Sequence, residues 1–478
     1  MRRLRVSSIL GGVLFVLSRA RLVLGIAFGA LFVYVWARRH ADAGLATRHA
    51  GFAAYCAEFE RLAVGDRRHV PALGGWGRAL SRIAARKSGA ESDLYEKAVD
   101  QCSSALQLNP DDISLTAKLA LLQFHRGTWS GGETARQCLS RACDLAEQIA
   151  NRSAQLRRSA LCLWGVSLAF LGRRTGYPEA AGLYSLAEQK YSAAMSLGPD
   201  DSIALYRAHP ILAQGLQIRG ESGHPFFERA CDEFRQLVTR NADNTAALAA
   251  WAESLFWLGI RSPDLEADRL FAQAENKCDS ALKTHRSDEG LLTALTLSLY
   301  GRAQARRAGE ANEFLSRAST LAETTLCAHR HYYRLLSAWP CVLHLRAERM
   351  PSEEVNRLLR EAICRFKDAA QAGADPDIIL GGWGAVLFAQ ARATEGPEAV
   401  KLFEAAREKY SEAESHSPGL YLFHLACVAA RLGNLDECKS WIVKSREPGI
   451  LISRDRMARD PDLANVRECD WFRELLAK

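Results

Sequence analysis

The sequence lacks the short motifs that mark the common catalytic sites. It contains no nucleotide-binding loop, no zincin histidine pair and no nucleophile elbow. Two glycine-rich stretches, Gly74–Gly77 and Gly381–Gly384, do not join a predicted strand to a helix, so they do not predict phosphate binding. We therefore expect no catalytic residue, no cofactor and no metal, and a protein that is not an enzyme.

Acidic residues are missing from residues 1–40, which contain seven arginines and two apolar runs. The second run, Leu22–Ala37, would be about 24 Å long as a helix, slightly shorter than a bilayer core. Flanking arginines can reach the membrane surface, and Tyr34 and Trp36 suit an interface. We predict a retained, single-pass N-terminal membrane anchor over residues 1–40. A cleaved signal peptide and a mitochondrial targeting sequence are the alternatives.

Arginines and cysteines predict opposite orientations of this anchor. Residues 1–21 contain five arginines and residues 38–57 contain three, which by the positive-inside rule would export the rest of the chain. The 13 cysteines are an odd number without a C-x-x-C pair, and free thiols favour a reducing compartment. We expect the cytosolic side, on a mitochondrial outer membrane or a bacterial inner membrane.

Positive charge is scarce beyond the N-terminus. Residues 1–87 contain 15 Lys/Arg and 4 Asp/Glu, whereas the remaining residues contain 47 and 51. The larger part of the chain is therefore slightly acidic, and we expect no nucleic-acid partner.

One pattern recurs at intervals of 43 to 45 residues. Leu94–Asp112 (LYEKAVDQCSSALQLNPDD) reads as an amphipathic helix that ends at a proline-containing turn, and copies begin at Cys138, Leu183, Phe226, Leu270, Phe314, Leu358 and Leu402. The fifth residue of each copy is alanine, which lets two helices cross closely: Ala98, Ala142, Ala187, Ala230, Ala274, Ala318, Ala362 and Ala406. Such repetition predicts a solenoid.

A second apolar helix precedes each of these helices. At a fixed interval before most of the alanines lies a small or special residue, and a tryptophan often comes directly before it: Trp76, Trp164, Trp251, Trp339 and Trp383. Each unit is therefore a helical hairpin whose apolar faces are buried only by stacking on its neighbours. Several cysteines occupy core positions of these hairpins: Cys102, Cys138, Cys162, Cys231, Cys278, Cys364 and Cys427.

The paired small residue, alanine, aromatic and proline resemble the tetratricopeptide repeat (TPR) from about Pro71 to Glu447. The repeats are about ten residues longer than the family's 34, which most simply lengthens both helices; the ninth copy, Leu420–Arg446, has family length. The resemblance implies an all-α, right-handed superhelical solenoid of about nine hairpins. We divide the chain into the anchor (1–40), a linker helix (41–70), the solenoid (71–447) and a C-terminal cap (448–478), where Asp460–Leu476 resembles a capping helix.

In the TPR family, the position four residues after the small residue of the first helix tends to face the concave groove. Here it holds Phe124, Ala169, Leu212, Phe256, Tyr300, His344 and Phe388. We predict that Phe124, Phe256, Tyr300, His344 and Phe388 bind a peptide or helix of a protein partner. The alternative is that these side chains pack between adjacent hairpins.

Two further groups have structural and functional interpretations. Arginines recur near the ends of the first helices (Arg82, Arg126, Arg173, Arg219, Arg261, Arg302, Arg346, Arg392 and Arg431), where they can stabilise the helix dipole or form a basic rim. Cys327, His329, His331, Cys341 and His344 are dense potential metal ligands, but their spacing matches no standard zinc framework.

These patterns predict a membrane-anchored, non-catalytic TPR scaffold or receptor that mediates protein–protein interaction. No asparagine falls inside a first helix, so the family's clamp for a C-terminal carboxylate is not expected. The alternative is a structural or assembly subunit of a bacterial or mitochondrial membrane protein complex. An enzyme is the third possibility, although no site for one assembles in the sequence.

Overall fold

The structure is a computed structural model that describes residues 92–218, 221–306, 308–349, 352–372, 374, 376–445 and 454–477. Every regular element within these residues is a helix, and all of them lie in the unit Leu80–Lys478. The predicted anchor and linker helix, as well as the first helix of the first hairpin, lie outside the described residues. In the described part of the chain, no helix has the length and apolar character needed to cross a bilayer.

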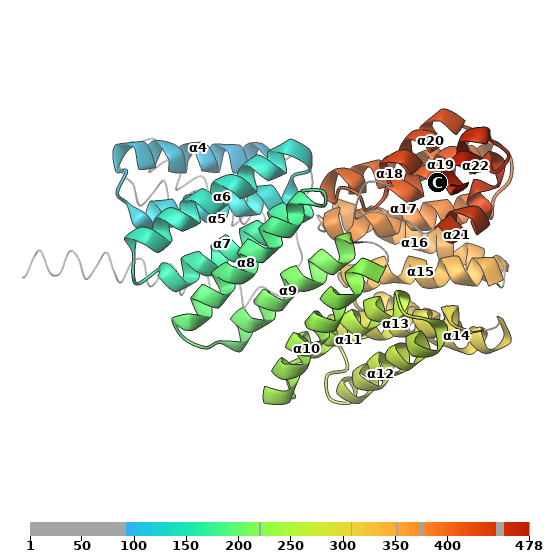
Figure 1. The fold of residues 1–478 in the computed structure, drawn as a ribbon, viewed down its shortest axis with the longest axis horizontal. Coiled ribbons are helices and arrows are strands. Elements are labelled where there is room, and N and C mark those ends of the chain that lie inside the picture. Colours follow the sequence, from blue (N-terminus) through green and yellow to red (C-terminus); the bar gives the residue numbers. More distant parts are fainter. Residues whose placement is uncertain are drawn as a thin grey trace, which may run out of the picture. The chain divides into compact units, whose positions relative to one another are not determined.

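The helices alternate between the two arms of successive hairpins (Figure 1). The first helices are α5 (Ile113–Trp129), α7 (Arg157–Arg173), α9 (Asp201–Gln217), α11 (Thr245–Ile260), α13 (Glu289–Gln304), α15 (Tyr333–Arg349), α17 (Pro376–Arg392) and α19 (Leu422–Arg431). The second helices are α4 (Ser92–Leu108), α6 (Gly132–Arg152), α8 (Glu179–Ser196), α10 (His224–Arg240), α12 (Asp264–Leu282), α14 (Ala308–Ala328), α16 (Glu353–Gln371), α18 (Pro397–His416) and α20 (Leu435–Lys444). The predicted all-α, TPR-like solenoid is confirmed.

The additional residues of each repeat extend the helices, as the sequence predicted. The helices from α5 to α18 contain 16 to 21 residues, whereas α19 and α20 of the last hairpin contain ten each. A single turn of 3₁₀ helix, η1 (Glu221–Gly223), leads into α10. Longer helices give each hairpin a longer buried face while the connections between helices stay short.

Local sequence sets the beginnings of several first helices. The side chains of Asp112, Asp200, Asn244 and Asp288 each accept a hydrogen bond from a backbone N–H in the following first turn, at 2.8 to 3.0 Å. These residues satisfy backbone donors that have no partner within the helix. The second helices α4, α8 and α18 each end shortly before a proline, as predicted. These prolines are Pro110, Pro199 and Pro418.

The repeat alanines are buried inside the solenoid. All those whose burial is described are 0% exposed: Ala142, Ala187, Ala230, Ala274, Ala318, Ala362 and Ala406. A second recurring contact joins a glycine of the first helix to a large side chain of the following helix. The pairs are Gly127–Leu139, Gly172–Tyr184, Gly215–Phe227 and Gly259–Phe271. A Cβ atom on Gly259 would lie 2.5 Å from Cε1 of Phe271, so the ring requires glycine there.

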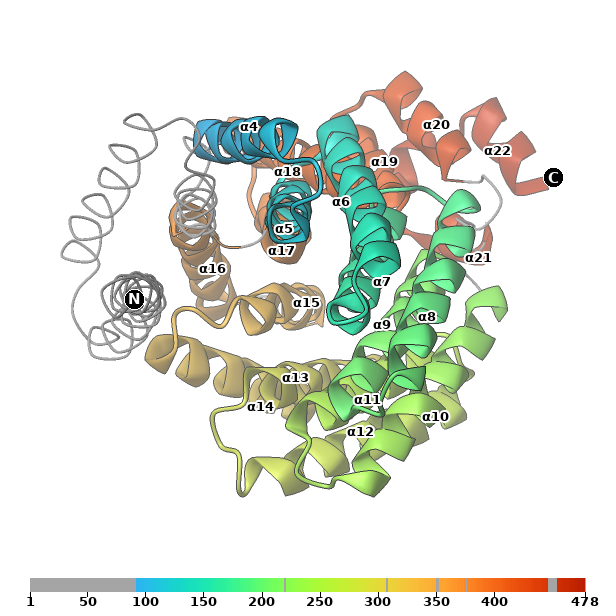
Figure 2. The same cartoon turned by 90° about the vertical axis from the view of Figure 1, so that its left-hand side faces the viewer.

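Successive hairpins stack mainly through their first helices in the middle of the solenoid. The helices α11, α13, α15 and α17 pack directly on one another, and the second helices α12, α14 and α16 lie outside them (Figure 2). Leucine and aromatic side chains of neighbouring hairpins form shared core clusters rather than one core per hairpin. This arrangement buries apolar faces that a single hairpin would leave exposed.

A buried arginine joins parts of the solenoid that are far apart in sequence. The guanidinium of Arg174, which is 1% exposed, donates 2.7 Å to the carbonyl oxygen of His416 and 2.9 Å to that of Thr128. His416 is the last residue of α18, and Thr128 belongs to the last turn of α5. Arg174 directly follows α7, so the end of this helix contacts a hairpin near the other end of the solenoid.

The C-terminal segment differs from the single capping helix expected over Asp460–Leu476. It consists of α21 (Arg454–Arg459), the 3₁₀ helix η2 (Pro461–Val466) and α22 (Asp470–Ala477). The Asp460 side chain accepts a hydrogen bond from the Asp462 N–H at 3.0 Å, and Arg467 donates to the Asp460 carbonyl at 2.8 Å. These contacts close a tight turn after Asp460, so the α-helix starts only at Asp470.

Candidate protein-binding surface

The structure places two of the five predicted partner-binding residues in the core. Phe256 is 2% exposed and Phe388 is 7% exposed. The Phe256 ring packs against Phe271 and Tyr300 at centroid distances of 5.8 and 6.3 Å, and the Phe388 ring meets Phe403 at 5.4 Å. Phe256 thus packs against its own hairpin and the next one, as the alternative interpretation has it, whereas the Phe388 contact joins the two helices of one hairpin. Partner binding at either residue stays a prediction.

The other three predicted residues are half-buried and lie in different surroundings. The Phe124 ring packs edge-on against Phe170 at 5.5 Å. Tyr300 accepts a hydrogen bond from Gln304 at 2.7 Å, and Nε2 of His344 lies 3.3 Å from a carboxylate oxygen of Glu348. Of the five, the structure brings only Phe256 and Tyr300 into ring contact. Partner binding at Phe124, Tyr300 and His344 stays a prediction.

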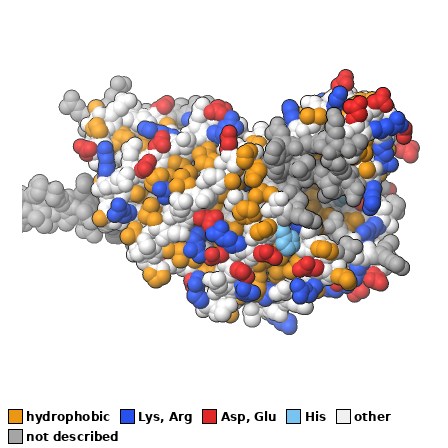
Figure 3. All heavy atoms as spheres, viewed as in Figure 1, with side chains coloured by type: hydrophobic (Ala, Val, Ile, Leu, Met, Phe, Trp, Pro, Cys, Tyr) orange, Lys and Arg blue, Asp and Glu red, His pale blue; other side chains and the backbone are white. Residues whose placement is uncertain are grey.

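Among the described residues, the recurring arginines are mostly paired and do not form an open basic rim; Arg82 and Arg219 lie outside the described residues. Arg302 pairs with Glu275 at 2.6 Å, and Arg392 pairs with Glu348 at 2.6 Å. Two more have framework partners: Arg346 donates 2.8 Å to the Ser319 hydroxyl, and Arg431 lies over the Phe403 ring. Basic and acidic side chains are accordingly interspersed on the face seen in Figure 3.

Two arginines at the ends of first helices cap the first helix of the preceding hairpin, and one of them, Arg261, also donates 3.5 Å to the Trp257 carbonyl of its own helix. Arg261 donates to the carbonyl oxygens of Gly215 and Ile218, both at 3.3 Å. Arg349 does the same two hairpins later, to Ala303 at 2.8 Å and Arg306 at 3.2 Å. For Arg261 the dipole interpretation holds for its own helix, and the guanidinium also reaches across to the C-terminal end of the neighbouring first helix.

The potential metal ligands around His329 do not assemble. His329 stacks on Tyr332 at 4.6 Å, and Cys327 accepts a hydrogen bond from Arg365 at 3.3 Å. Within the described residues, no group of three His, Cys, Asp or Glu side chains is placed to hold a metal ion. Five of the seven predicted core cysteines are buried, but Cys162 is half-buried and Cys364 is exposed, because their helix faces point outward.

The tryptophans of the first helices have a partner that sequence reasoning missed. A cation of the second helix lies over the ring in four hairpins: Lys190 over Trp164 and Lys277 over Trp251, both at 3.4 Å, Lys409 over Trp383 at 4.9 Å, and Arg365 over Trp339 at 6.0 Å. The separation of cation and tryptophan along the chain is the same in all four, which was a detectable signal. These cation–π contacts join the two arms of each hairpin and leave the cation near its outer surface.

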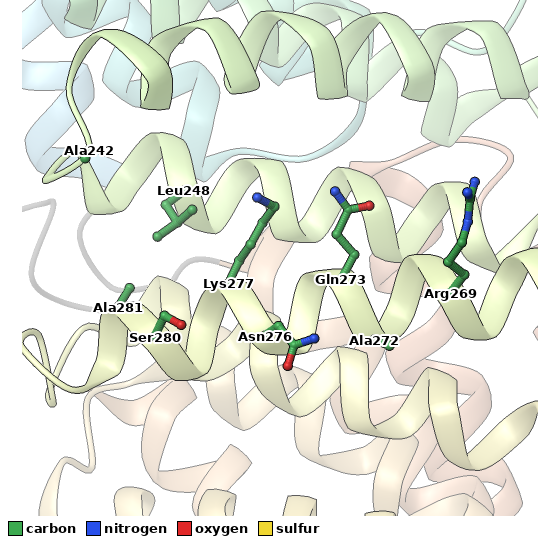
Figure 4. Close-up of a pocket in the computed structure, with 9 residues that line it drawn as sticks. All are labelled: Ala242, Leu248, Arg269, Ala272, Gln273, Asn276, Lys277, Ser280 and Ala281. Carbon is green, nitrogen blue, oxygen red and sulfur yellow. The ribbon is translucent and has the colours of Figure 1, made fainter.

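One of these cations lines an open hollow on the outer side of the solenoid. The hollow has a volume of about 880 Å³ and lies between α12 and the start of α11 with the loop before it. Arg269, Gln273 and Lys277 rise side by side from α12 towards the neighbouring helix (Figure 4). Its lining residues are Ala242, Leu248, Arg269, Ala272, Gln273, Asn276, Lys277, Ser280 and Ala281.

The repeat in the sequence and the stacked helical hairpins together identify the structural class of the protein. The chain is a TPR-like helical repeat protein. No protein-family model matches the sequence, and no curated protein matches it.

Several solved structures resemble it distantly. The human IFIT1 dimer with m7Gppp-AAAA is 14% identical, with 82% of this chain and 80% of the other covered and a TM-score of 0.43. The TPR domain of P58(IPK) is 13% identical over 86% and 99% of the two chains, with a TM-score of 0.21. The TPR2AB domain of yeast Sti1 in its pHSP90 complex is 11% identical over 58% and 99%, with a TM-score of 0.22.

Proposed function

We propose that this protein is a non-catalytic scaffold or receptor, anchored in a membrane by residues 1–40, that binds a protein partner through its helical repeats. The open hollow on α12 is the observation that supports partner binding most directly. It combines small apolar residues with exposed polar ones, which is the composition of a protein interface rather than of an enclosed small-molecule site.

The buried polar groups of the described residues support a role without catalysis. Burial raises the pKa of the Cys278 thiol to about 12 and that of the Cys438 thiol to about 12. A thiol with so high a pKa is a poor nucleophile at neutral pH. The buried Arg174 and Arg346 are held by hydrogen bonds to carbonyl and hydroxyl oxygens of the framework.

The outer position of the hollow supports the second candidate, a fixed assembly subunit of a membrane protein complex. A subunit can be bound on its convex surface, whereas a receptor for short peptides in this fold would use the concave side. Purification of the full-length protein in mild detergent distinguishes the two. A partner at fixed stoichiometry that persists through size exclusion indicates a subunit, and a partner lost on dilution indicates a receptor.

Membrane anchoring is tested by comparing the full-length protein with a chain that lacks residues 1–40. We expect the full-length protein to stay in the membrane pellet after carbonate treatment, because the apolar run would be inserted in the bilayer. The shortened chain should be helical and soluble, since the described solenoid begins well after the deletion. Release of the full-length protein by carbonate would contradict the anchor.

A further inference from the structure

We infer that the hollow on α12 binds an acidic helical segment of a protein partner. The inference rests on the proposed function and names both the surface and the chemistry of the partner. Two properties of the lining lead to it: the linear arrangement of its side chains, and the sign of its charge.

The lining side chains of α12 form two parallel rows. Arg269, Gln273, Lys277 and Ala281 succeed one another at intervals of four residues, and Ala272, Asn276 and Ser280 form the adjacent row. Residues four apart lie on the same face of a helix, and about twelve residues extend about 18 Å. Such rows leave a groove between them into which the side-chain ridge of a second helix can pack. The shape of the hollow therefore suits a helical segment of about three turns.

The floor of the hollow permits close approach. Ala272 and Ala281 on α12, Ala242 in the loop before α11, and Leu248 provide small or apolar surface. Small side chains allow two helix backbones to lie near each other, as the repeat alanines do inside the solenoid. A partner helix with a narrow apolar face would bury this floor while its flanks remain in water.

The polar lining is basic in a solenoid that is nearly neutral. The hollow is lined by two cations, by the amides of Gln273 and Asn276 and by the Ser280 hydroxyl, and by no carboxylate. Residues 80–478 together contain 50 Lys/Arg and 51 Asp/Glu. In the described part of the chain, the Gln273 and Asn276 amides form no hydrogen bond with another residue, so both can donate to a partner carboxylate. The charge of the hollow thus complements glutamate or aspartate.

The two cations are presented in different ways. The Arg269 side chain is 77% exposed, and its Glu266 neighbour is 3.8 Å away on the same helix. Lys277 is held over the Trp251 ring, and burial together with the nearby Arg235 lowers the pKa of its ammonium group. A carboxylate that enters the hollow would offset this unfavourable environment of the charged lysine. The fixed lysine and the exposed arginine can thus contact carboxylates that lie about two turns apart on an acidic helix.

The same positions on α18 provide a matched control. Lys401 is the counterpart of Arg269 three repeats further on; its side chain is 76% exposed, and it pairs with Glu398 three residues earlier, as Arg269 pairs with Glu266. The surface around Lys401, however, contains Glu404, Glu408 and Glu437. A change of charge at either position breaks the same kind of ion pair with the residue three positions earlier, but only Arg269 borders a hollow lined without carboxylates.

The test uses the full-length protein in detergent and a fluorescent, 18-residue amphipathic peptide of leucine, alanine and glutamate. A peptide with lysine in place of glutamate and a single-stranded RNA of similar charge are the competing probes. We expect anisotropy to show binding of the acidic peptide, with the affinity reduced at least tenfold by the substitution Arg269→Glu. Lys401→Glu should leave the affinity unchanged, and higher salt should weaken binding.

Three outcomes would overturn the inference: no binding of the acidic peptide, equal loss of affinity in the Lys401→Glu variant, or equal binding of the basic peptide. Preferential binding of the RNA would also overturn it, because it would identify the anion as nucleic acid. Each of these outcomes would remove the hollow as support for partner binding, whereas the scaffold function itself is decided separately by co-purification. Equal thermal unfolding of the variants and the native protein confirms that charge, not folding, is being compared.

Discussion

At the scale of single residues, glycines of one helix contact large side chains of a neighbouring helix, and these contacts hold the hairpins together. Phe271 of α12 lies against Gly259 of α11 and also against Gly301 of α13. One ring therefore joins three helices from two hairpins. Such a contact depends on the absence of a Cβ atom, since close-packed interiors have no room for an additional methyl group.

The substitution Gly259→Ala should lower the free energy of unfolding by about 1–3 kcal/mol, because the new methyl group would meet the Phe271 ring. Gly182→Ala is the matched control: Gly182 lies inside α8, and a Cβ there meets nothing within 4 Å. It should raise the stability by about 0.5–1 kcal/mol, the helix preference of alanine over glycine. Urea unfolding followed by circular dichroism measures both; equal effects would contradict the packing described.

At the scale of elements, a chain of charged groups joins the last hairpins to the C-terminal segment. Glu348 of α15 contacts His344 at 3.3 Å and Arg392 of α17 at 2.6 Å. Arg392 in turn lies 3.6 Å from Asp462 of η2. The hydrogen bond from His344, with that from Arg392, holds the pKa of Glu348 at about 2, whereas burial raises the pKa of Asp462.

These shifts predict how Glu348 contributes to stability as pH changes. Its folded pKa of about 2 is below its usual 4.5, so the contribution is fully present above about pH 5 and is lost as pH falls towards 2. The stability difference between the native protein and Glu348→Gln should therefore be largest near neutral pH and shrink across this window. Urea unfolding at a series of pH values measures it. A constant difference between the native protein and Glu348→Gln across this pH range would refute the prediction.

At the scale of the described solenoid, Arg174 links hairpins that nearest-neighbour stacking would never bring together. Repeat proteins are usually stabilised by contacts between adjacent units. Here one guanidinium satisfies carbonyl oxygens at the ends of both α5 and α18. Because the last carbonyls of a helix carry partial negative charge and have no partner within it, a buried cation is well placed there.

The substitution Arg174→Met should lower the free energy of unfolding by about 2–4 kcal/mol, since it removes the guanidinium donors of two buried carbonyl groups. It should also accelerate amide hydrogen exchange near residues 128–130 and 413–417. Arg349→Met is the control, because Arg349 donates only to the end of the hairpin before it. It should leave exchange at 413–417 unchanged. Unaltered exchange at these residues in Arg174→Met would show that the long-range contact contributes nothing.

The sequence determined the repeat unit, its two helices and the tight contacts of its alanines. Periodic spacing from Ala142 to Ala406 identifies the same helix face in every unit, because each unit meets the same neighbours and so needs the same small residue. The glycines that precede a large side chain at a fixed interval, and the cations that follow four of the tryptophans at another, were readable in the same way. Contacts that repeat with the unit leave a repeating trace in the sequence.

Only the tertiary structure decided what lies at a surface and what joins distant units. The burial of Phe256 depends on how closely α11 and α13 stack, and the contact of Arg174 with His416 depends on small rotations accumulated over several hairpins. The hollow on α12 is lined jointly by two helical rows of α12 and by Ala242 and Leu248, which come from the loop before α11 and from α11 itself. None of these follows from periodicity, since equivalent positions in the sequence acquire different surroundings once the units are stacked.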